Sequence, residues 1–325
     1  MPNQPTDFLY AFVLDGKGGG QRLEDGAIDS WSTDDGTLWL HFDTANELAC
    51  RWLLNRSGLP ELAVETMLAD ETRPRTVVFD DGLLIVLRGV NTNPGDDPED
   101  MVSVRIWIDQ HRVVSTRRRQ LLSVVDLADA LKAGRGPRTS GGLLAMLVER
   151  IAARIGGFVD AIEARIDDAE SDIDDSKIAP MRVKVASLRR QIAAVRRFLA
   201  PQRDALDRLT RQRLAYIDEA DGQTLYQEGD RITRHLEDLD LARERTILLK
   251  DDLTSQIAEQ QNSRMYVLSI VAAVFLPLGF ITGLLGMNVG GLPGVDEPRG
   301  FLISVFAMAA AAVLLIVLFR WKRWL

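Results

Sequence analysis

Two apolar runs near the C-terminal end constrain the fold of this chain more than any other feature. Residues Met265–Leu285 and Phe301–Phe319 contain no Asp, Glu, His, Lys or Arg. A helix of about twenty residues rises about 30 Å, which matches the hydrocarbon core of a bilayer. The sequence therefore predicts a membrane hairpin of two transmembrane helices, 265–285 and 301–319, joined by a loop at 286–300.

The composition excludes several kinds of partner and metal site for the long segment before the hairpin. The 325-residue chain carries 47 acidic and 39 basic residues, and its net charge of −8 argues against a nucleic acid partner. Cys50 is the only cysteine, which excludes a disulfide framework and a Cys-x-x-Cys metal site. The first twenty residues lack a basic n-region and an apolar stretch of signal-peptide length, so we expect the N-terminal part in the cytoplasm.

Basic residues after the second span set the expected orientation. The basic tail 320–325 carries Arg320 and Lys322, whereas the loop 286–300 carries one basic residue beside Asp296 and Glu297. The positive-inside rule then places both termini in the cytoplasm and the loop on the periplasmic side of a bacterial inner membrane. We expect the two carboxylates of the loop to attract cations at the outer mouth.

Residues 1–139 predict a cytoplasmic α/β domain. Strand-like runs alternate there with Gly, Asp and Asn clusters, and Asp81-Gly82 is a hairpin signal between two of them. The expected strands are Phe8–Leu14, Thr37–Phe42, Arg75–Phe79, Leu83–Arg88, Val102–Ile108 and Arg112–Thr116, and the expected helices are Ala45–Asn55 and Pro60–Leu68.

The next segments show the three- and four-residue spacing of long helices. Residues 140–222 predict antiparallel cytoplasmic helices, and residues 223–264 predict a stalk helix that continues into the first span. The landmarks are helices Gly141–Glu170 and Pro180 to about Ala220, a kink at Pro201 and a break at Gly222. The expected fold class is α+β with a membrane part, and so long a helix implies bundling with copies of itself.

One face of the stalk helix and first span is built from small and polar residues. Steps of four and three residues, the spacing of a coiled-coil seam, follow what we call the small-residue face. It consists of Asp251, Ser255, Ala258, Asn262, Met265, Ser269, Ala272, Leu276, Gly279 and Gly283. Its neighbours, such as Val271 and Phe275, are bulky. Parallel identical helices would turn this face towards a water-filled pore, and close helix packing in lipid is the alternative.

The tripeptide Gly286-Met287-Asn288, directly after the first span, carries a resemblance to a known family. With the continuation Val-Gly-Gly-Leu-Pro-Gly, the chain resembles the CorA superfamily of two-span divalent-metal transporters, in its ZntB-like zinc transporter branch. Further stretches similar to that branch are Leu68–Arg75, Leu87–Asn91 and Leu199–Arg203. The resemblance covers essentially the entire chain.

The resemblance implies a homopentamer in membrane lipid whose axial pore takes up zinc across a bacterial inner membrane. It makes Gly286, Met287 and Asn288 the selectivity filter, in which amides and carbonyls contact the hydrated ion without stripping its water. The implied narrow points are Asn288, Gly279, Leu276, Leu268 or Ser269, Met265 and Asp251. Many members have threonine where this chain has Gly279, which removes a hydroxyl ring and widens the pore. No cofactor is implied, because Zn²⁺ or another divalent cation is the cargo.

The residues leave the ion and the energy source open. The ZntB-like branch implies coupling to protons, yet the first span holds no Asp, Glu, His, Lys or Arg for a relay. Coupling would therefore use pore water, Asp251, Asp296 or Glu297. The span also lacks His and Cys, so soft ligands do not select zinc there. A magnesium or cobalt channel of the same architecture and a non-transporting membrane-anchored sensor are the alternatives. No catalytic constellation favours an enzyme.

An acidic run between the two long cytoplasmic helices is a candidate regulatory metal site. It contains Asp167, Asp168, Glu170, Asp172, Asp174 and Asp175. Such carboxylates could bind a cytoplasmic divalent ion weakly, and a solvated turn between helices is the alternative. His41, His111 and His235 lie far apart, and we expect ordinary polar or half-buried residues rather than zinc ligands.

Overall fold

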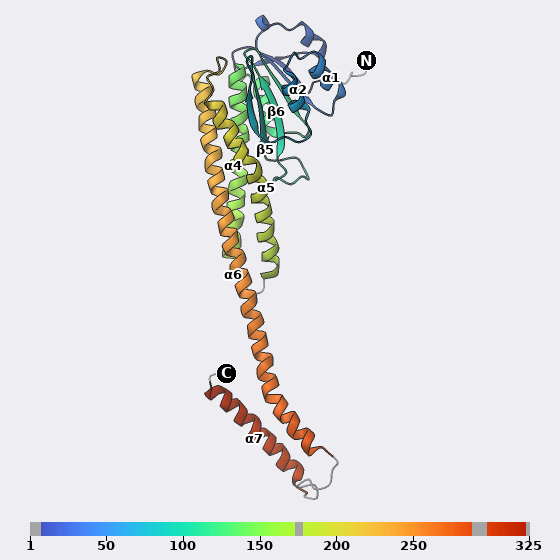
Figure 1. Cartoon of the computed structure of the whole chain (residues 1–325), viewed down its shortest axis with the longest axis vertical. Coiled ribbons are helices and arrows are strands. Elements are labelled where there is room, and N and C mark those ends of the chain that lie inside the picture. The colour runs from blue at the N-terminus through green and yellow to red at the C-terminus, as the bar shows by residue number, and fades with distance from the viewer. Residues whose placement is uncertain (1–7, 173–177, 288–297, 323–325) are drawn as a thin grey trace. The chain divides into compact units, whose positions relative to one another are not determined.

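The computed structural model describes residues 8–172, 178–287 and 298–322, apart from the side chains of Asp25 and Leu285 (Figure 1). The chain divides into two compact units, Met1–Lys250 and Asp251–Leu325. We call them the N-terminal and the C-terminal unit.

A seven-stranded sheet forms the centre of the N-terminal unit, in the order β2-β1-β3-β7-β6-β5-β4. The strands are β1 (Tyr10–Leu14), β2 (Gly20–Arg22), β3 (Leu38–Asp43), β4 (Arg75–Val78), β5 (Leu83–Gly89), β6 (Val102–Ile108) and β7 (Arg112–Arg117). Neighbours are antiparallel except β3 and β7, which are parallel. The six predicted strands are confirmed to within two residues at each end. Sequence reasoning missed β2, whose three residues include no bulky apolar side chain.

The hairpin predicted at Asp81-Gly82 joins β4 and β5, which pair antiparallel. The turn is closed by a hydrogen bond from the Phe79 amide to the Gly82 carbonyl at 2.8 Å. A Cβ on Gly82 would lie 2.5 Å from an indole carbon of Trp107 and 2.8 Å from the Ile108 carbonyl oxygen. Only glycine therefore fits where this turn crosses β6.

Helices cover both faces of the sheet (Figure 1). Helices α1 (Glu47–Asn55) and α2 (Glu61–Leu68) pack on one face, over a core that includes Leu40, Phe42 and Trp107. Helices α4 (Ser140–Ser171) and α5 (Ile178–Thr210) contact the other face, and α3 (Leu122–Lys132) packs on α4 and β2. Both predicted short helices are confirmed. Sequence reasoning missed α3, which begins after Leu121 without a capping side chain to announce it.

Helix α6 (Glu219–Leu285) begins earlier than predicted. The break lies over residues 211–218, so the break predicted at Gly222 is wrong. Asp218 caps α6 by accepting the Asp221 amide at 2.8 Å, and Gly222 donates to the Asp218 carbonyl in the first turn. Gly222 therefore makes the first i to i−4 hydrogen bond of the helix instead of breaking it. Helix α5 continues through Pro201 to Thr210, and a kink at Pro201 stays a prediction.

The C-terminal unit consists of the end of α6 and helix α7 (Gly300–Trp321). Both helices are long and apolar enough to cross a membrane, and none of the residues in their most apolar windows is buried. Residues 265–285 are helical throughout, as predicted, and α7 extends the second predicted span at both ends.

Candidate functional site

The small-residue face is exposed along α6 in the C-terminal unit. All ten of its residues, from Asp251 to Gly283, are exposed, with Met265 at 67% and Leu276 at 75% of full exposure. Exposure alone does not distinguish this face, because bulky neighbours such as Phe280, at 70%, are exposed as well.

The position of the partly covered residues distinguishes the faces of α6. Within the first span, Ile270, Val274, Leu278 and Ile281 are among the partly covered residues. At 3.6 residues per turn, these four lie on the side of the helix opposite Ser269, Ala272, Leu276, Gly279 and Gly283. Helix α7 has a matching stripe of partly covered residues, which includes Ser304, Met308, Ala311 and Leu315. The small-residue face is therefore the side of α6 that the rest of the hairpin leaves open.

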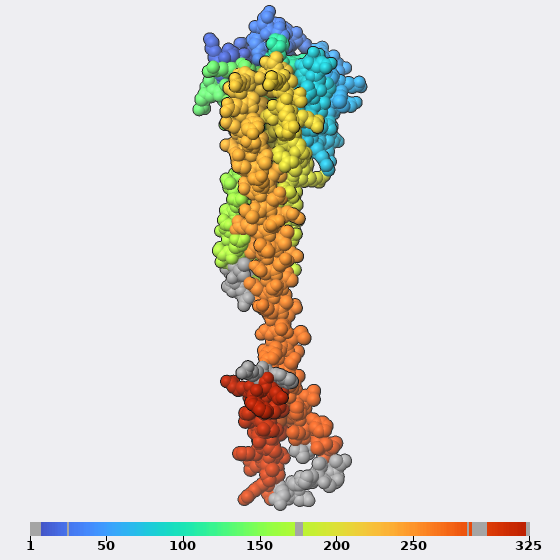
Figure 2. Space-filling model, turned by 60° about the vertical axis from the view of Figure 1, so that its left-hand side comes forward, coloured from blue at the N-terminus to red at the C-terminus, as the bar shows by residue number. Residues whose placement is uncertain are grey.

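The same face continues into the N-terminal unit at seven-residue spacing through Leu248 and Leu241. These side chains are 66% and 61% exposed. On the other side of the helix, Leu239 and Leu249 are buried in the N-terminal unit. Contacts to α4 and α5 lie on that covered part of α6, as between Gly156 and His235. Figure 2 shows α6, in yellow and orange, with a long side uncovered by the other helices of this unit.

The glycines of the small-residue face are not required by contacts within the chain. A Cβ on Gly279 or Gly283 would meet nothing within 4 Å. The hydroxyl of Ser269 donates to the Met265 carbonyl at 2.8 Å, which leaves its oxygen lone pairs free to accept. At Gly279 and Gly283, the described residues of the chain therefore leave open space beside this face.

The predicted filter begins where α6 ends. The Gly286 amide donates to the Thr282 carbonyl at 2.9 Å, and the Met287 amide donates to the Leu284 carbonyl at 3.5 Å. The side chain of Met287 is 47% exposed. Asn288 lies outside the described residues, as do Asp296 and Glu297 of the predicted outer mouth.

Two residues of the acidic run form ion pairs rather than an open cluster. Arg245 of α6 donates to Asp167 at 2.5 Å and to Glu170 at 2.9 and 2.5 Å. These two carboxylates raise the pKa of the Arg245 guanidinium. Asp168 lies in the last turn of α4, and Asp172 is the residue that follows the helix and donates its amide to the Asp168 carbonyl. Asp174 and Asp175 lie outside the described residues. Among the described residues, no three His, Cys, Asp or Glu side chains are grouped to hold a metal ion, and the regulatory site stays a prediction.

The three histidines have different surroundings. His41 is buried in β3, where its Nδ1 lies 2.9 Å from the Ser115 hydroxyl, and burial lowers its pKa to about 3. His111 is exposed. His235 of α6 packs against Gly156 of α4, with its Nδ1 3.8 Å from a carboxylate oxygen of Asp238, and burial lowers its pKa.

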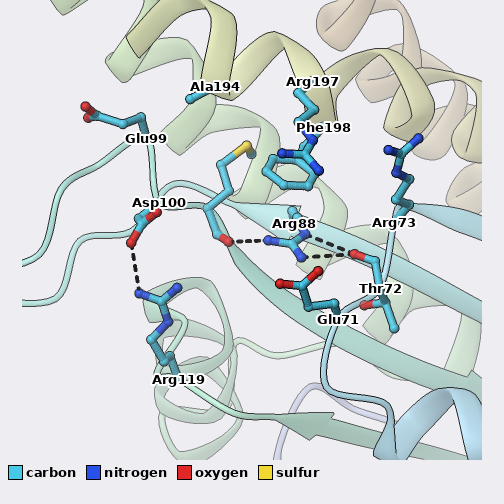
Figure 3. A pocket seen from close by; sticks show the side chains of 11 residues that line it. Glu71, Thr72, Arg73, Arg88, Glu99, Asp100, Arg119, Ala194, Arg197 and Phe198 are labelled. Atoms are coloured by element: carbon cyan, nitrogen blue, oxygen red, sulfur yellow. Dashed lines mark hydrogen bonds and ion pairs between the residues drawn. The ribbon is translucent and has the colours of Figure 1, made fainter. Parts of the chain in front are cut away.

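A basic pocket of the N-terminal unit was not predicted from the sequence. It lies between the ends of β5 and β6 and helix α5, and its most prominent side chains are Arg73, Arg88, Arg119, Arg197 and Phe198 (Figure 3). Three of the stretches that carry the family resemblance contribute to or adjoin this pocket. Arg73 lies in Leu68–Arg75, Arg88 lies in Leu87–Asn91, and Phe198 directly precedes Leu199–Arg203. Because these residues are far apart in sequence, only the fold reveals that they share a pocket.

Comparisons with known proteins agree over nearly the whole chain. The family model described as CorA-like Mg²⁺ transporter protein matches residues 34–323. The divalent cation transporter CmaX of Pseudomonas aeruginosa is 39% identical over 320 residues, which are 98% of this chain and 96% of that protein. The zinc transport protein ZntB of Yersinia enterocolitica is 36% identical over 324 residues, 99% of this chain and 97% of that protein. The solved structure of full-length CmaX has a TM-score of 0.84 and 37% identity, and the match covers 100% of both chains.

Proposed function

The chain belongs to the family of CorA-like Mg²⁺ transporter proteins, and from this premise we propose that it takes up Zn²⁺ through the axial pore of a homopentamer. It is a divalent cation transporter of the CorA and ZntB type and not an enzyme. The proposal adds the ion, the direction, the assembly and the residues along the path.

The position of the small-residue face supports the pore. In both units this face lies opposite the side of α6 that the chain's own elements cover, and its glycines meet no neighbour. Copies of α6 arranged around an axis can therefore line a common channel without displacing α7 or the other long helices. The pore-lining residues proposed are Asp251, Ser255, Asn262, Met265, Leu268, Ser269, Ala272, Leu276, Gly279 and Gly283.

The proposed topology has both termini in the cytoplasm of a bacterium and the loop 286–300 in the periplasm. Residues 1–139 form the cytoplasmic α/β domain, 140–222 the antiparallel helices and 223–264 the stalk. Residues 265–285 and 301–319 cross the inner membrane, and the basic tail 320–325 stays on the cytoplasmic side. Asp296 and Glu297 would then raise the local concentration of cations at the outer mouth.

The proposed filter acts on a hydrated ion. Five copies of the Asn288 amide and of the Gly286 carbonyl present oxygen and nitrogen groups that can hydrogen-bond the water shell of a divalent cation. Removing inner-shell water is costly for such ions, so contact through water allows binding that remains weak enough for release. Met287, between them in the sequence, is the third residue of the proposed filter.

The choice of zinc is supported by the zinc transport protein ZntB, 36% identical over 99% of this chain. No His or Cys lies between Met265 and Leu285, so the pore offers no soft ligands that would prefer zinc. A magnesium or cobalt channel of the same architecture is therefore the second candidate, and it agrees with the description of the family. Competition of zinc uptake by Mg²⁺ and by Co²⁺ distinguishes the two.

Proton coupling is a further part of the proposal. The first span contains no Asp, Glu, His, Lys or Arg, so a relay of such side chains cannot run through it. Coupling would require pore water together with Asp251 at the cytoplasmic side or the carboxylates of the loop. Zinc uptake that does not respond to a pH gradient would exclude symport while leaving the pore in place.

The decisive experiment measures isotopic zinc uptake by the purified protein in liposomes, with and without a pH gradient. We expect Asn288→Ala to abolish flux while assembly, measured by mass, stays intact. Asn55→Ala, at an exposed asparagine of α1, is the matched control and should transport normally. Unchanged uptake by Asn288→Ala contradicts the filter, and no uptake by the unmodified protein favours the membrane-anchored sensor.

A further inference from the structure

The basic pocket of the N-terminal unit has the size and chemistry of a small-molecule site. Its volume is about 490 Å³, within the range of ligand pockets in proteins. Four arginines line it, Arg73 from the loop before β4, Arg88 from β5, Arg119 from the segment after β7 and Arg197 from α5 (Figure 3). Four separate chain segments thus bring guanidinium groups to one place.

Arg88 is held rigidly on the floor of this pocket. Its Nε and one terminal nitrogen donate to the Thr72 carbonyl at 3.2 and 3.0 Å, and the other terminal nitrogen donates to the Met101 carbonyl at 2.8 Å. Its Cζ lies 4.0 Å from the centre of the Phe198 ring. These hydrogen-bonding and ring partners are neutral, so the contacts fix the position of the guanidinium. The carboxylate of Glu71 lies beside it (Figure 3) and partly balances its charge, without a hydrogen bond between the two in the described residues.

Two of the other arginines have no partner among the described residues. Neither Arg73 nor Arg197 makes a hydrogen bond or an ion pair within the described part of the chain. The Cζ of Arg197 lies 5.5 Å from the centre of the same Phe198 ring, on the α5 side of the pocket (Figure 3). Arg119 is occupied in part, at 3.5 Å from Asp100 and 3.7 Å from Asp96. Burial lowers the pKa of Arg88 most. The negative charge of Glu71 acts in the opposite direction, and the positive charges of Arg119 and Arg197 add to the lowering.

Carboxylates also border the pocket, and they limit what it can bind. Asp100 is paired with Arg119, whereas Glu71 and Glu99 have no ion pair among the described residues, and a buried oxygen of Glu99 has no hydrogen-bond partner there. The pocket is therefore not a uniformly positive surface for a large polyanion. It suits a compact anion that reaches Arg73, Arg88 and Arg197 together.

We propose that this pocket binds a compact phosphate-bearing anion with at least two phosphoryl groups, such as pyrophosphate or the phosphate tail of a nucleotide. Guanidinium groups match phosphate oxygens in paired hydrogen bonds, and three of them around one cavity bind a diphosphate better than a single phosphate. Bound anion also relieves the repulsion between the clustered arginines. This site is independent of the proposed pore and uses none of its residues.

The test titrates the full-length protein in detergent with sodium pyrophosphate and follows the heat of binding. We expect Arg197→Gln and Arg73→Gln each to raise the dissociation constant at least about tenfold, as expected for loss of one charge-assisted hydrogen bond. Arg190→Gln is the matched control, because Arg190 is exposed on the same helix seven residues earlier and outside the pocket. It should bind as the unmodified protein does.

Two further titrations make the result decisive. Orthophosphate should bind more weakly than pyrophosphate, and ATP at least as tightly if the pocket accepts a nucleotide tail. Arg197→Lys keeps the charge but loses the paired geometry, so it should weaken binding less than Arg197→Gln does. The proposal is overturned if pyrophosphate does not bind in the millimolar range, or if the double variant Arg73→Gln/Arg197→Gln binds it as well as the unmodified protein. Zinc flux is not part of this readout, so a failure here leaves the proposed transport untouched.

Discussion

The two units of this chain differ in whether their apolar side chains are buried or exposed. In the N-terminal unit, Phe42 and Leu40 are fully buried between the sheet and its helices. In the C-terminal unit, Phe280 and Phe306 are 70% and 80% exposed. The first unit therefore buries its apolar side chains in its own core. The second leaves them exposed on two helices that are long and apolar enough to cross a membrane.

This difference shows which features of the molecule a single chain can determine. In the N-terminal unit, the buried hydroxyl of Ser115 has its partners inside the same chain, Trp39 and His41. Around the small-residue face, no partner from the same chain limits Gly279 or Gly283. In the proposed pore, this face is lined up with copies of itself, so substitutions on it should affect transport more than folding.

The largest effect is expected from filling the small-residue face. Ala272→Trp should reduce zinc flux by about tenfold or more, because five indole rings would obstruct a channel lined by small side chains. The measurement is isotopic uptake into liposomes at equal amounts of reconstituted protein. Val271→Trp is the control, since Val271 is exposed on the same turn but lies away from this face. Equal loss of flux in both variants would mean that the face does not line the path.

The second largest effect is on the free energy of unfolding, which should respond differently to substitutions in the two units. Phe42→Ala should destabilise the N-terminal unit by about 3–5 kcal/mol, because it removes a fully buried ring from a packed core. Phe280→Ala should change the same unfolding transition by less than about 0.5 kcal/mol, since that ring is 70% exposed and belongs to the other unit. Urea unfolding in detergent, followed by circular dichroism, measures both. A large effect of Phe280→Ala on this transition would show that the units do not fold independently.

Local patterns were sufficient to predict most of the fold. Alternation over Val102–Ile108 gave a strand with the correct bounds, and the apolar runs gave both long helices of the hairpin. The misses have local causes: β2 is short and polar, α3 lacks a capping side chain, and Gly222 sits in a first turn where a glycine is tolerated. Local patterns therefore predict that a helix or strand is present more reliably than they predict where it begins and ends.

Contacts between distant segments could not be predicted. The sequence presents the acidic run as an open cluster, but Arg245 on α6 pairs with Asp167 and Glu170, some seventy-five residues away. The basic pocket gathers Arg73, Arg88 and Arg197 only because β5 and α5 pack together. Spacing along the chain carries no information about such pairs. The exposed small-residue face was predictable because it is a property of one helix.

The smallest expected effect concerns pH, and it acts on the N-terminal unit alone. The folded pKa of His41 is lowered from 6.5 to about 3 by burial, so the folded protein keeps this ring neutral while the unfolded chain takes up a proton below about pH 6.5. Its contribution to stability is thus complete above the unfolded pKa and is lost as the pH falls. Between about pH 7.5 and pH 5 the free energy of unfolding should decrease by about 2 kcal/mol through His41.

His41→Asn should remove this part of the pH dependence, because the amide does not titrate and can still reach the Ser115 hydroxyl. Urea unfolding at several pH values measures it, and His111→Gln, at an exposed position, should keep the unmodified slope. An unchanged slope in His41→Asn would mean that other groups carry the acid sensitivity. The first span has no Asp, Glu, His, Lys or Arg, so the pH dependence of zinc flux should be the same in His41→Asn as in the unmodified protein. A different pH dependence of flux in His41→Asn would instead mean that protonation of His41 affects transport. The two units would then not respond to pH independently.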